Sequence, residues 1–469
     1  MLFTSQLFVF YFLPLALLGY YLLPVPRNLF LLLLGYIFYG WWNPGYTLLL
    51  LTVTLVNYAG GQTIARNSAN ERRRFRALVL TLCLSLGILG FFKYFTFFEQ
   101  NVNAILHGLG MQPLPVLKIP LPVGISFYIF LSISYPISLY IEESPAARSF
   151  TDFACYVSLF PLVISGPIVR YKQIVDQLSQ RTHSLDKFAS GVSLFILGFA
   201  KKIFLANGIA KTADAVFAAE SLGALDAWFG ILAYTMQIYF DFSGYSDVAI
   251  GLGRMFGFEF TRNFNAPYLA DSITDFWRRW HISLSTMLRD YVYVPLIAVG
   301  RNRNPKFLIY RNLILTMLIC GLWHGATWTF ILWGGLHGIL LAFEQWRGKK
   351  GVYARLPQAA RIGITFLTIL FSWVLFRSPT LSDAARYFSA MLGLVGASGG
   401  SVLLNGVIYT QGNLLIAVLC VLLVFQPRQA FEWSEKITVF KAALLIVLFG
   451  FSLAGMFAQS FSPFLYSQF

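Results

Sequence analysis

A histidine inside an apolar stretch has the position in this chain that most suggests chemistry, since His324 lies in the run GLWHG at positions 321–325. A charge at the centre of a membrane helix costs about 2.5 kcal/mol or more, but an imidazole can stay neutral if it has a hydrogen-bond partner. A neutral ring can accept the proton of an attacking hydroxyl near pH 7. The flanking Gly321 and Gly325 would let another backbone or a ligand come close. We therefore predict that His324 is a general base, with a structural histidine as the alternative.

A second histidine lies in a segment, residues 258–311, whose composition suits neither lipid nor plain water. Its central part, Asp275–Asp290, reads DFWRRWHISLSTMLRD. On one helix, Trp277 and His281 would share a face at i,i+4, and Arg278 would neighbour His281 at i,i+3. Such a helix suits the floor of a cavity, and the alternative is an interfacial helix held by its Trp and Arg side chains. The two histidines together fit direct transfer of a group between a donor and an acceptor.

A third group of polar residues lies in the predicted helix 226–253. It includes Tyr239, Asp241, Ser243 and Asp247, in an otherwise apolar sequence. A carboxylate buried in a membrane bundle must face a partner or a water-filled cavity. We predict that these four side chains line a substrate channel, and the alternative is that they join neighbouring helices by polar contacts.

The sequence predicts no metal site, because it contains no HExxH and no cysteine–histidine quartet. His337 follows His324 by 13 positions, which on a single helix would place the two rings on roughly opposite faces. His337 is therefore interpreted either as a packing or hydrogen-bonding residue or as a catalytic one. The four cysteines are far apart in apolar runs and are predicted to be buried.

Composition identifies the class of protein that must position these side chains. Of the 469 residues, 57% are hydrophobic and 12% charged, against about 45–50% and about 25% in soluble proteins. A soluble globule could not hide so much apolar surface, which excludes soluble enzymes, nucleic-acid binders and disulfide scaffolds. The net charge of +15 is typical of basic cytoplasmic loops and of contact with anionic lipid or an anionic ligand.

The apolar segments predict an all-α, polytopic bundle with roughly 10–12 crossings. The candidates are 6–23, 28–42, 45–60, 77–98, 121–141, 153–169, 188–206, 226–253, 312–332, 333–346, 362–377, 403–425 and 439–458. The arginine-rich loop 66–76 is predicted to be cytoplasmic, and counting back three helices places Arg27 on the same side. We predict one membrane domain over residues 1–469, with a polar catalytic core at about 226–346.

Four motifs carry a resemblance to a known family. They are Asp275–Asp290, the GLWHG run at 321–325, Tyr239–Gly253 (YFDFSGYSDVAIGLG) and Leu121–Tyr128 (LPVGISFY). The sequence resembles the membrane-bound O-acyltransferase family, in the bacterial branch that acetylates exopolysaccharides. The likeness covers approximately the first five-sixths of the chain, and its central motifs are specific.

The resemblance implies a helical bundle around a central tunnel open toward both faces of the bacterial inner membrane. It implies that His324 and His281 are the two active-site histidines. The donor would be acetyl-CoA, entering from the cytoplasm, with no bound cofactor. The acyl group would pass to a periplasmic acetyltransferase or another acceptor-presenting partner, beside the polysaccharide synthase machinery.

Further residues are candidates for substrate binding. Arg278, Arg279 and Arg289 would steer the anionic donor or, equally, anchor the segment at the interface. Asp290, Trp277 and Trp323 complete the candidates. The polymer, with alginate and cellulose as examples, stays open. So do three alternatives: a transporter of a sugar, lipid or acyl carrier, D-alanyl transfer to a cell-wall polymer, and a scaffold that recruits a periplasmic transferase.

Overall fold

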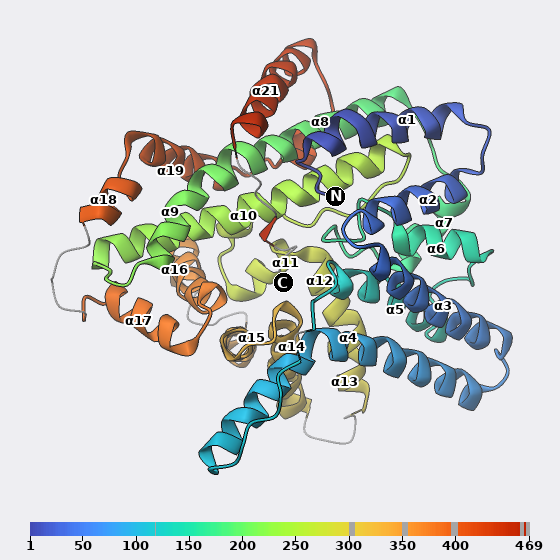
Figure 1. Cartoon of the computed structure of the whole chain (residues 1–469), viewed down its shortest axis with the longest axis horizontal. Coiled ribbons are helices and arrows are strands. Elements are labelled where there is room, and N and C mark those ends of the chain that lie inside the picture. The colour runs from blue at the N-terminus through green and yellow to red at the C-terminus, as the bar shows by residue number, and fades with distance from the viewer. Residues whose placement is uncertain (118, 300–304, 349–354, 395–401, 460–463, 466–469) are drawn as a thin grey trace. The chain divides into compact units, whose positions relative to one another are not determined.

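The computed structural model describes residues 1–117, 119–299, 305–348, 355–394, 402–459 and 464–465, and every regular element in these ranges is a helix (Figure 1). The all-α prediction is thereby confirmed. The residues group into two compact units. The first holds residues 1–192 and 249–261, and the second holds residues 193–248 and the described residues from 262 onward.

The first unit contains the N-terminal helices. They are η1 (Phe8–Phe12), α1 (Leu13–Leu22), α2 (Arg27–Gly40), α3 (Pro44–Arg66), α4 (Glu71–Gly108), α5 (Ile125–Tyr140), α6 (Phe150–Ser158), α7 (Tyr171–Ser179) and the start of α8 (Leu185–Ala200). Side chains cap several N-termini: Asn43 accepts from Gly45 N at 2.9 Å, and Ser149 accepts from Asp152 N at 3.1 Å. Such caps satisfy backbone donors that a helix leaves without intrahelical partners.

The second unit contains most of the range 226–346 that was predicted to hold the polar core. Its elements are the end of α8, η2 (Lys201–Ala206), α9 (Asn207–Ala218), most of α10 (Ala224–Met255), η3 (Pro267–Leu269), α11 (Ile273–Arg279), α12 (Ile282–Leu288), η4 (Arg289–Tyr293), α13 (Val294–Val299), α14 (Pro305–His324), α15 (Trp328–Arg347), α16 (Gln358–Arg377), α17 (Leu381–Met391), α18 (Val402–Ile408), α19 (Gln411–Val424), α20 (Ala430–Trp433) and α21 (Val439–Ala458). Helices α14 and α15 lie side by side (Figure 1).

The chain is a multi-pass membrane protein. Six helices in the described ranges are long and apolar enough to cross a membrane: 44–66, 71–108, 185–218, 306–324, 358–377 and 439–458. Four further apolar helices have 10–17 residues, namely 8–22, 27–40, 125–140 and 411–424. Helix length and hydropathy do not test the predicted number of crossings, about 10–12, which stays a prediction.

Several predicted segments have different boundaries in the structure. The segment 153–169 is not one helix, because α6 ends at Ser158 and irregular turns follow, with prolines at 161 and 167. The predicted boundary at 332/333 is wrong, because α14 already ends at His324 and α15 begins at Trp328, after Thr327 as its N-cap. The segment 403–425 is likewise divided into α18 and α19.

Candidate active site

His324 is the last residue of α14, where the helix stops before the turn at 325–327. Its side chain is enclosed by protein, with 1% of the residue exposed. The centroids of three aromatic rings surround the imidazole: Trp323 at 4.9 Å, Phe376 at 5.1 Å and Trp333 at 5.2 Å. These rings come from α14, α16 and α15. The predicted general base therefore lies in the interior of the second unit and does not face lipid.

Glycines hold α14 against α15 and thereby fix the position of His324. A Cβ on Gly321 would overlap the carbonyl oxygen of Phe330, and a Cβ on Gly334 would overlap the carbonyl oxygen of Met317. Side chains do not approach backbone this closely, so the contact between the helices requires glycine at both positions. At Gly325, the ring of Phe330 fills the space that a Cβ would occupy. The glycines of the GLWHG run thus admit a neighbouring helix.

His281 lies between α11 and α12, in a left-handed backbone conformation with φ 44° and ψ 53°. Helix α11 ends at Arg279, and α12 begins at Ile282. The prediction that Trp277 and His281 share the face of one helix is therefore wrong. A left-handed residue cannot continue a right-handed helix, and the chain changes direction at this position.

The side chain of Asn263 holds this turn in place. Its carbonyl oxygen accepts hydrogen bonds from Ser283 Oγ at 2.9 Å and Ser283 N at 3.2 Å, and it lies 3.1 Å from His281 Nδ1. Its amide nitrogen donates to Ser246 Oγ of α10 at 3.1 Å. Burial lowers the pKa of His281 to about 3, so the ring is neutral at pH 7. Because the Asn263 oxygen can only accept, Nδ1 carries the proton and Nε2 is the basic nitrogen.

Replacing Asn263 with alanine is expected to lower the free energy of unfolding by about 1–3 kcal/mol, because buried donors on His281 and Ser283 lose their acceptor. Thermal unfolding of the detergent-solubilised protein measures the effect. Asn265→Ala is the matched control, since the backbone of Asn265 bonds to Arg279 O at 2.9 Å and its side chain is only half-buried. Equal losses at the two positions would show that Asn263 has no special role.

The indole of Trp323 lies next to both histidines. Its centroid is 4.9 Å from that of His324 and 6.0 Å from that of His281. His281 is fully buried, and its ring packs edge-on against Phe242 of α10 at 4.6 Å. The structure therefore brings together two imidazoles that are far apart in the sequence, with one shared aromatic neighbour.

His337 lies on α15, whereas His324 belongs to α14, so the predicted arrangement on a single helix does not apply. The indole nitrogen of Trp277 donates a hydrogen bond to His337 Nδ1 at 3.2 Å, and both residues are buried. The centroid of Trp333, which contacts His324, is 4.9 Å from that of His337. This geometry supports the hydrogen-bonding interpretation of His337 and gives Trp277 a role in joining α11 to α15.

The three arginines between residues 275 and 290 differ in their surroundings. Arg279 Nε forms an ion pair with Asp275 at 2.8 Å, one turn earlier on α11. Arg289 Nε pairs with the adjacent Asp290 at 2.7 Å, and the Arg289 side chain is 63% exposed. Arg278 is exposed and has no ion pair among the described residues. Of the three arginines, Arg278 is thus the one whose charge is available for an anionic molecule, and donor steering stays a prediction.

Two acidic residues of α10, Asp241 and Asp247, pair with two consecutive lysines. Lys202 Nζ donates to Asp241 Oδ1 at 2.5 Å, and both side chains are at most 3% exposed. Lys201 Nζ donates to Asp247 Oδ2 at 2.7 Å. A backbone N–H, that of Leu465, donates to the second oxygen of Asp241 at 2.8 Å. These contacts match the alternative in which polar residues join helices, and channel lining stays a prediction.

Local geometry explains how both lysines reach α10. They begin a π-helical turn, η2, directly after α8, and such turns insert an extra residue into a helix. A Cβ on Gly198 would lie 2.5 Å from the carbonyl oxygen of Gly244, so α8 approaches α10 closely just before the lysines. The sequence held a signal for this contact that the prediction missed: two adjacent lysines in the apolar segment 188–206, which require partners.

The remaining predicted residues of α10 are also buried. The hydroxyl of Tyr239 donates to Gln429 Oε1, and Ser243 is 2% exposed. Asn263 and Gln429 were not predicted as site residues, since nothing in their sequence surroundings separates them from other polar positions. Within the described ranges, no group of three or more His, Cys, Asp or Glu side chains is placed to hold a metal ion.

The arrangement suits proton transfer in an enclosed site. An imidazole enclosed by aromatic rings, as His324 is, can accept a proton from a hydroxyl brought next to it. Enclosure removes competing water and fixes the orientation of the reacting groups. The second imidazole has a defined tautomer because of Asn263, with Nδ1 as the donor and Nε2 as the basic nitrogen.

Comparison with known proteins supports the family resemblance. The model of the membrane-bound O-acyltransferase family matches residues 143–349. The chain is 43% identical to the probable alginate O-acetylase AlgI of Azotobacter vinelandii over 100% of both chains. It is 47% identical to the protein of the same name from Pseudomonas aeruginosa, over 83% of this chain and 75% of that one. It is 34% identical to the peptidoglycan O-acetyltransferase of Helicobacter pylori, over 100% of this chain and 98% of that one.

Proposed function

Since the chain belongs to the membrane-bound O-acyltransferase family and is an O-acyltransferase, we propose that it supplies acetyl groups for the O-acetylation of a secreted polysaccharide. Relatives named for alginate and for peptidoglycan share this chemistry, since both names describe acetyl transfer to a polysaccharide. Alginate is the proposed polymer, because the relatives of highest identity reported above are named for it.

The observation that carries the proposal is the position of His324. The ring lies at the end of a helix, enclosed by aromatic side chains, and its neighbour Trp323 also lies next to His281. An enclosed imidazole of this kind can act as a general base on a hydroxyl. His324 is the proposed general base, and His281 is the proposed second active-site residue that binds a reacting group through Nε2.

The proposed reaction has one covalent exchange. An imidazole nitrogen of His324 removes the proton of the acceptor hydroxyl, and that oxygen forms a bond to the carbonyl carbon of the acyl donor. With a thioester donor, the carbon–sulfur bond breaks, and the leaving thiolate takes the proton back from the imidazolium. Acetyl-CoA on the cytoplasmic side is the proposed donor. Holding both reactants in one enclosed site would supply much of the rate by proximity.

The proposed setting is the bacterial inner membrane, where a donor from the cytoplasm and an acceptor outside it can reach one site. The acceptor hydroxyl belongs either to the polymer or to a periplasmic acetyltransferase that passes the acetyl group on. The chain would then be one component of a polymer-acetylating system that includes the polysaccharide synthase. A tunnel that joins both faces at His324 is part of this proposal.

Cells that lack the chain are expected to secrete the polymer in normal amount but without its O-acetyl esters, because the proposed role is modification and not synthesis. Mass analysis of the secreted polymer measures both quantities, and reintroducing the gene is the control. Cells fed labelled acetate should carry the label as base-labile esters only when the chain is present. Unchanged acetyl content would refute the proposal, and loss of polymer export with esters retained would favour the transporter hypothesis.

A further inference from the structure

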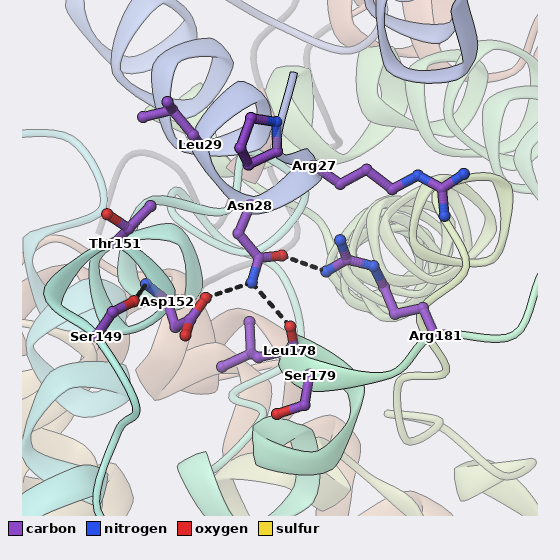
Figure 2. A pocket seen from close by; sticks show the side chains of 10 residues that line it. Arg27, Asn28, Leu29, Ser149, Thr151, Asp152, Leu178, Ser179 and Arg181 are labelled. Carbon is purple, nitrogen blue, oxygen red and sulfur yellow. Dashed lines mark hydrogen bonds between the residues drawn. The ribbon is translucent and has the colours of Figure 1, made fainter. Parts of the chain in front are cut away.

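The first unit contains a cleft of about 470 Å³ that none of the proposed chemistry uses. It lies where α2 and α6 begin and where the chain leaves α7, and its lining includes Arg27, Asn28, Asp152 and Arg181 (Figure 2). A volume of this size is within the usual range for small-molecule sites. The question is which ligand its polar groups would bind.

Two guanidinium groups of the cleft are held by aromatic rings. The Cζ atom of Arg27 lies 5.3 Å from the centroid of Tyr20, and that of Arg181 lies 6.0 Å from the same centroid and 4.5 Å from that of Phe258. In the described part of the chain, neither arginine forms an ion pair with a carboxylate. Their positive charges are therefore available to an anionic ligand, and stacking already restricts their side chains.

The side-chain amide of Asn28 connects the residues at the floor of the cleft, and it bonds to the acidic residue there, Asp152. Arg181 Nη1 donates to Asn28 Oδ1 at 2.7 Å, and Asn28 Nδ2 donates to Asp152 Oδ1 at 2.5 Å and to Leu178 O at 2.8 Å. Figure 2 shows these three bonds converging on the amide, with the guanidinium groups of Arg27 and Arg181 on the same side of it in this view. Asp152 thus bonds to an amide and leaves both guanidinium groups without a carboxylate partner.

The start of α2 adds to the positive electrostatic potential of the cleft, and the pKa of a neighbouring histidine responds to the two arginine charges. Helix α2 begins at Arg27 after Pro26, and among the described residues no side chain caps its N-terminus, so the first N–H groups of α2 carry the positive end of the helix dipole. Burial, and after it the charges of Arg27 and Arg181, lower the pKa of the neighbouring His183. Backbone N–H groups at a helix start together with guanidinium forks are the groups that bind phosphate.

The surroundings of the cleft indicate the source of the phosphate. The chain that leads to it from α1 exposes Leu22, Leu23 and Val25, with 73%, 53% and 38% of each residue exposed. These side chains follow an apolar helix and suit contact with acyl chains. The predicted topology places Arg27 on the cytoplasmic side, where anionic lipids attract basic residues.

We propose that Arg27, Arg181 and the N-terminus of α2 bind the phosphate of an anionic phospholipid head group. The Arg27 and Arg181 forks would each donate to phosphate oxygens, and the exposed apolar side chains would lie against the lipid tails. The site belongs to the first unit, whereas His324 belongs to the second, and it does not depend on the acyl-transfer proposal. Its role would be to anchor α1 and α2 at one leaflet.

Native mass spectrometry of the full chain in neutral detergent tests the site. Phosphatidylglycerol is expected to remain bound at concentrations at which phosphatidylcholine with the same acyl chains does not. Arg27→Gln and Arg181→Gln should each weaken phosphatidylglycerol binding about tenfold, the loss of one charge-assisted contact. Arg72→Gln is the matched control, because Arg72 is exposed and lies outside the cleft.

Three results would overturn the proposal: equal retention of the two lipids, unchanged binding by both cleft variants, and an equal loss with Arg72→Gln. Displacement of phosphatidylglycerol by glycerol 3-phosphate at the same concentration would also overturn the lipid assignment and give the site to a soluble phosphate ester. Arg27→Lys keeps the charge but loses the fork, and we expect it to bind with intermediate affinity. Thermal unfolding of each variant identifies any that fails to fold.

Discussion

Replacing His324 with alanine should reduce acetyl transfer by about 10²–10⁴-fold, the usual contribution of a general base. The ring is enclosed by Trp323, Trp333 and Phe376, with 1% of the residue exposed, so no other side chain can easily take its place. The measurement is the O-acetyl content of the secreted polymer in cells that contain the variant at the wild-type level.

Two further variants make the His324 result interpretable. His324→Gln retains hydrogen-bonding groups and most of the volume but cannot take up a proton, so it should be as inactive as alanine if the ring is a base. His107→Ala removes an exposed histidine at the end of α4 and should leave acetylation unchanged. Normal acetylation by folded His324→Ala protein would support the scaffold hypothesis in place of catalysis.

Replacing Lys202 with methionine should cause the largest loss of stability, about 3–5 kcal/mol in the free energy of unfolding, because it leaves a buried carboxylate without its partner. The Lys202 and Asp241 side chains are 3% and 2% exposed, so water cannot replace the lost contact. Thermal or denaturant unfolding of the solubilised protein measures the change.

The double variant Lys202→Met/Asp241→Leu distinguishes the cost of an unpaired buried charge from the loss of the ion pair itself. Removing both charges should restore much of the stability, since the desolvation of an unpaired ion is then absent. Arg289→Gln is the control for an exposed pair and should have little effect, because its partner Asp290 is adjacent and the arginine is 63% exposed. A single variant as stable as the wild type would show that Asp241 does not depend on Lys202.

The fold class followed from composition, because a chain this apolar can bury its backbone polar groups in a membrane only as helices or a closed barrel. Helix boundaries were less predictable. The end of α14 at His324 has no proline, and the break depends on tertiary contact between Phe330 and Gly325 and on Thr327 as a cap. Hydropathy averages over such a local feature, so the predicted segment continued to residue 332.

The sequence singled out the two histidines of the candidate site but not the residues that hold them in place. His324 and His281 stand out because an ionisable group in apolar or aromatic surroundings is costly and is retained only with a partner or a function. Asn263 does not stand out, because its role arises from a turn that brings it next to His281, 18 residues away. The lysine partners of α10 were visible in the sequence, but pairing them with Asp241 and Asp247 requires knowing that α8 packs against α10.

The backbone at His281 restricts what can stand at that position, whatever the ring does. Its φ of 44° is costly for most residues, whereas asparagine and glycine adopt it readily. Alanine there would favour a right-handed turn and redirect α11 and α12 together, so lost turnover in such a variant would mix chain geometry with imidazole chemistry. Asparagine keeps the direction of the chain and removes the ring alone, which makes it the informative exchange for separating the two contributions.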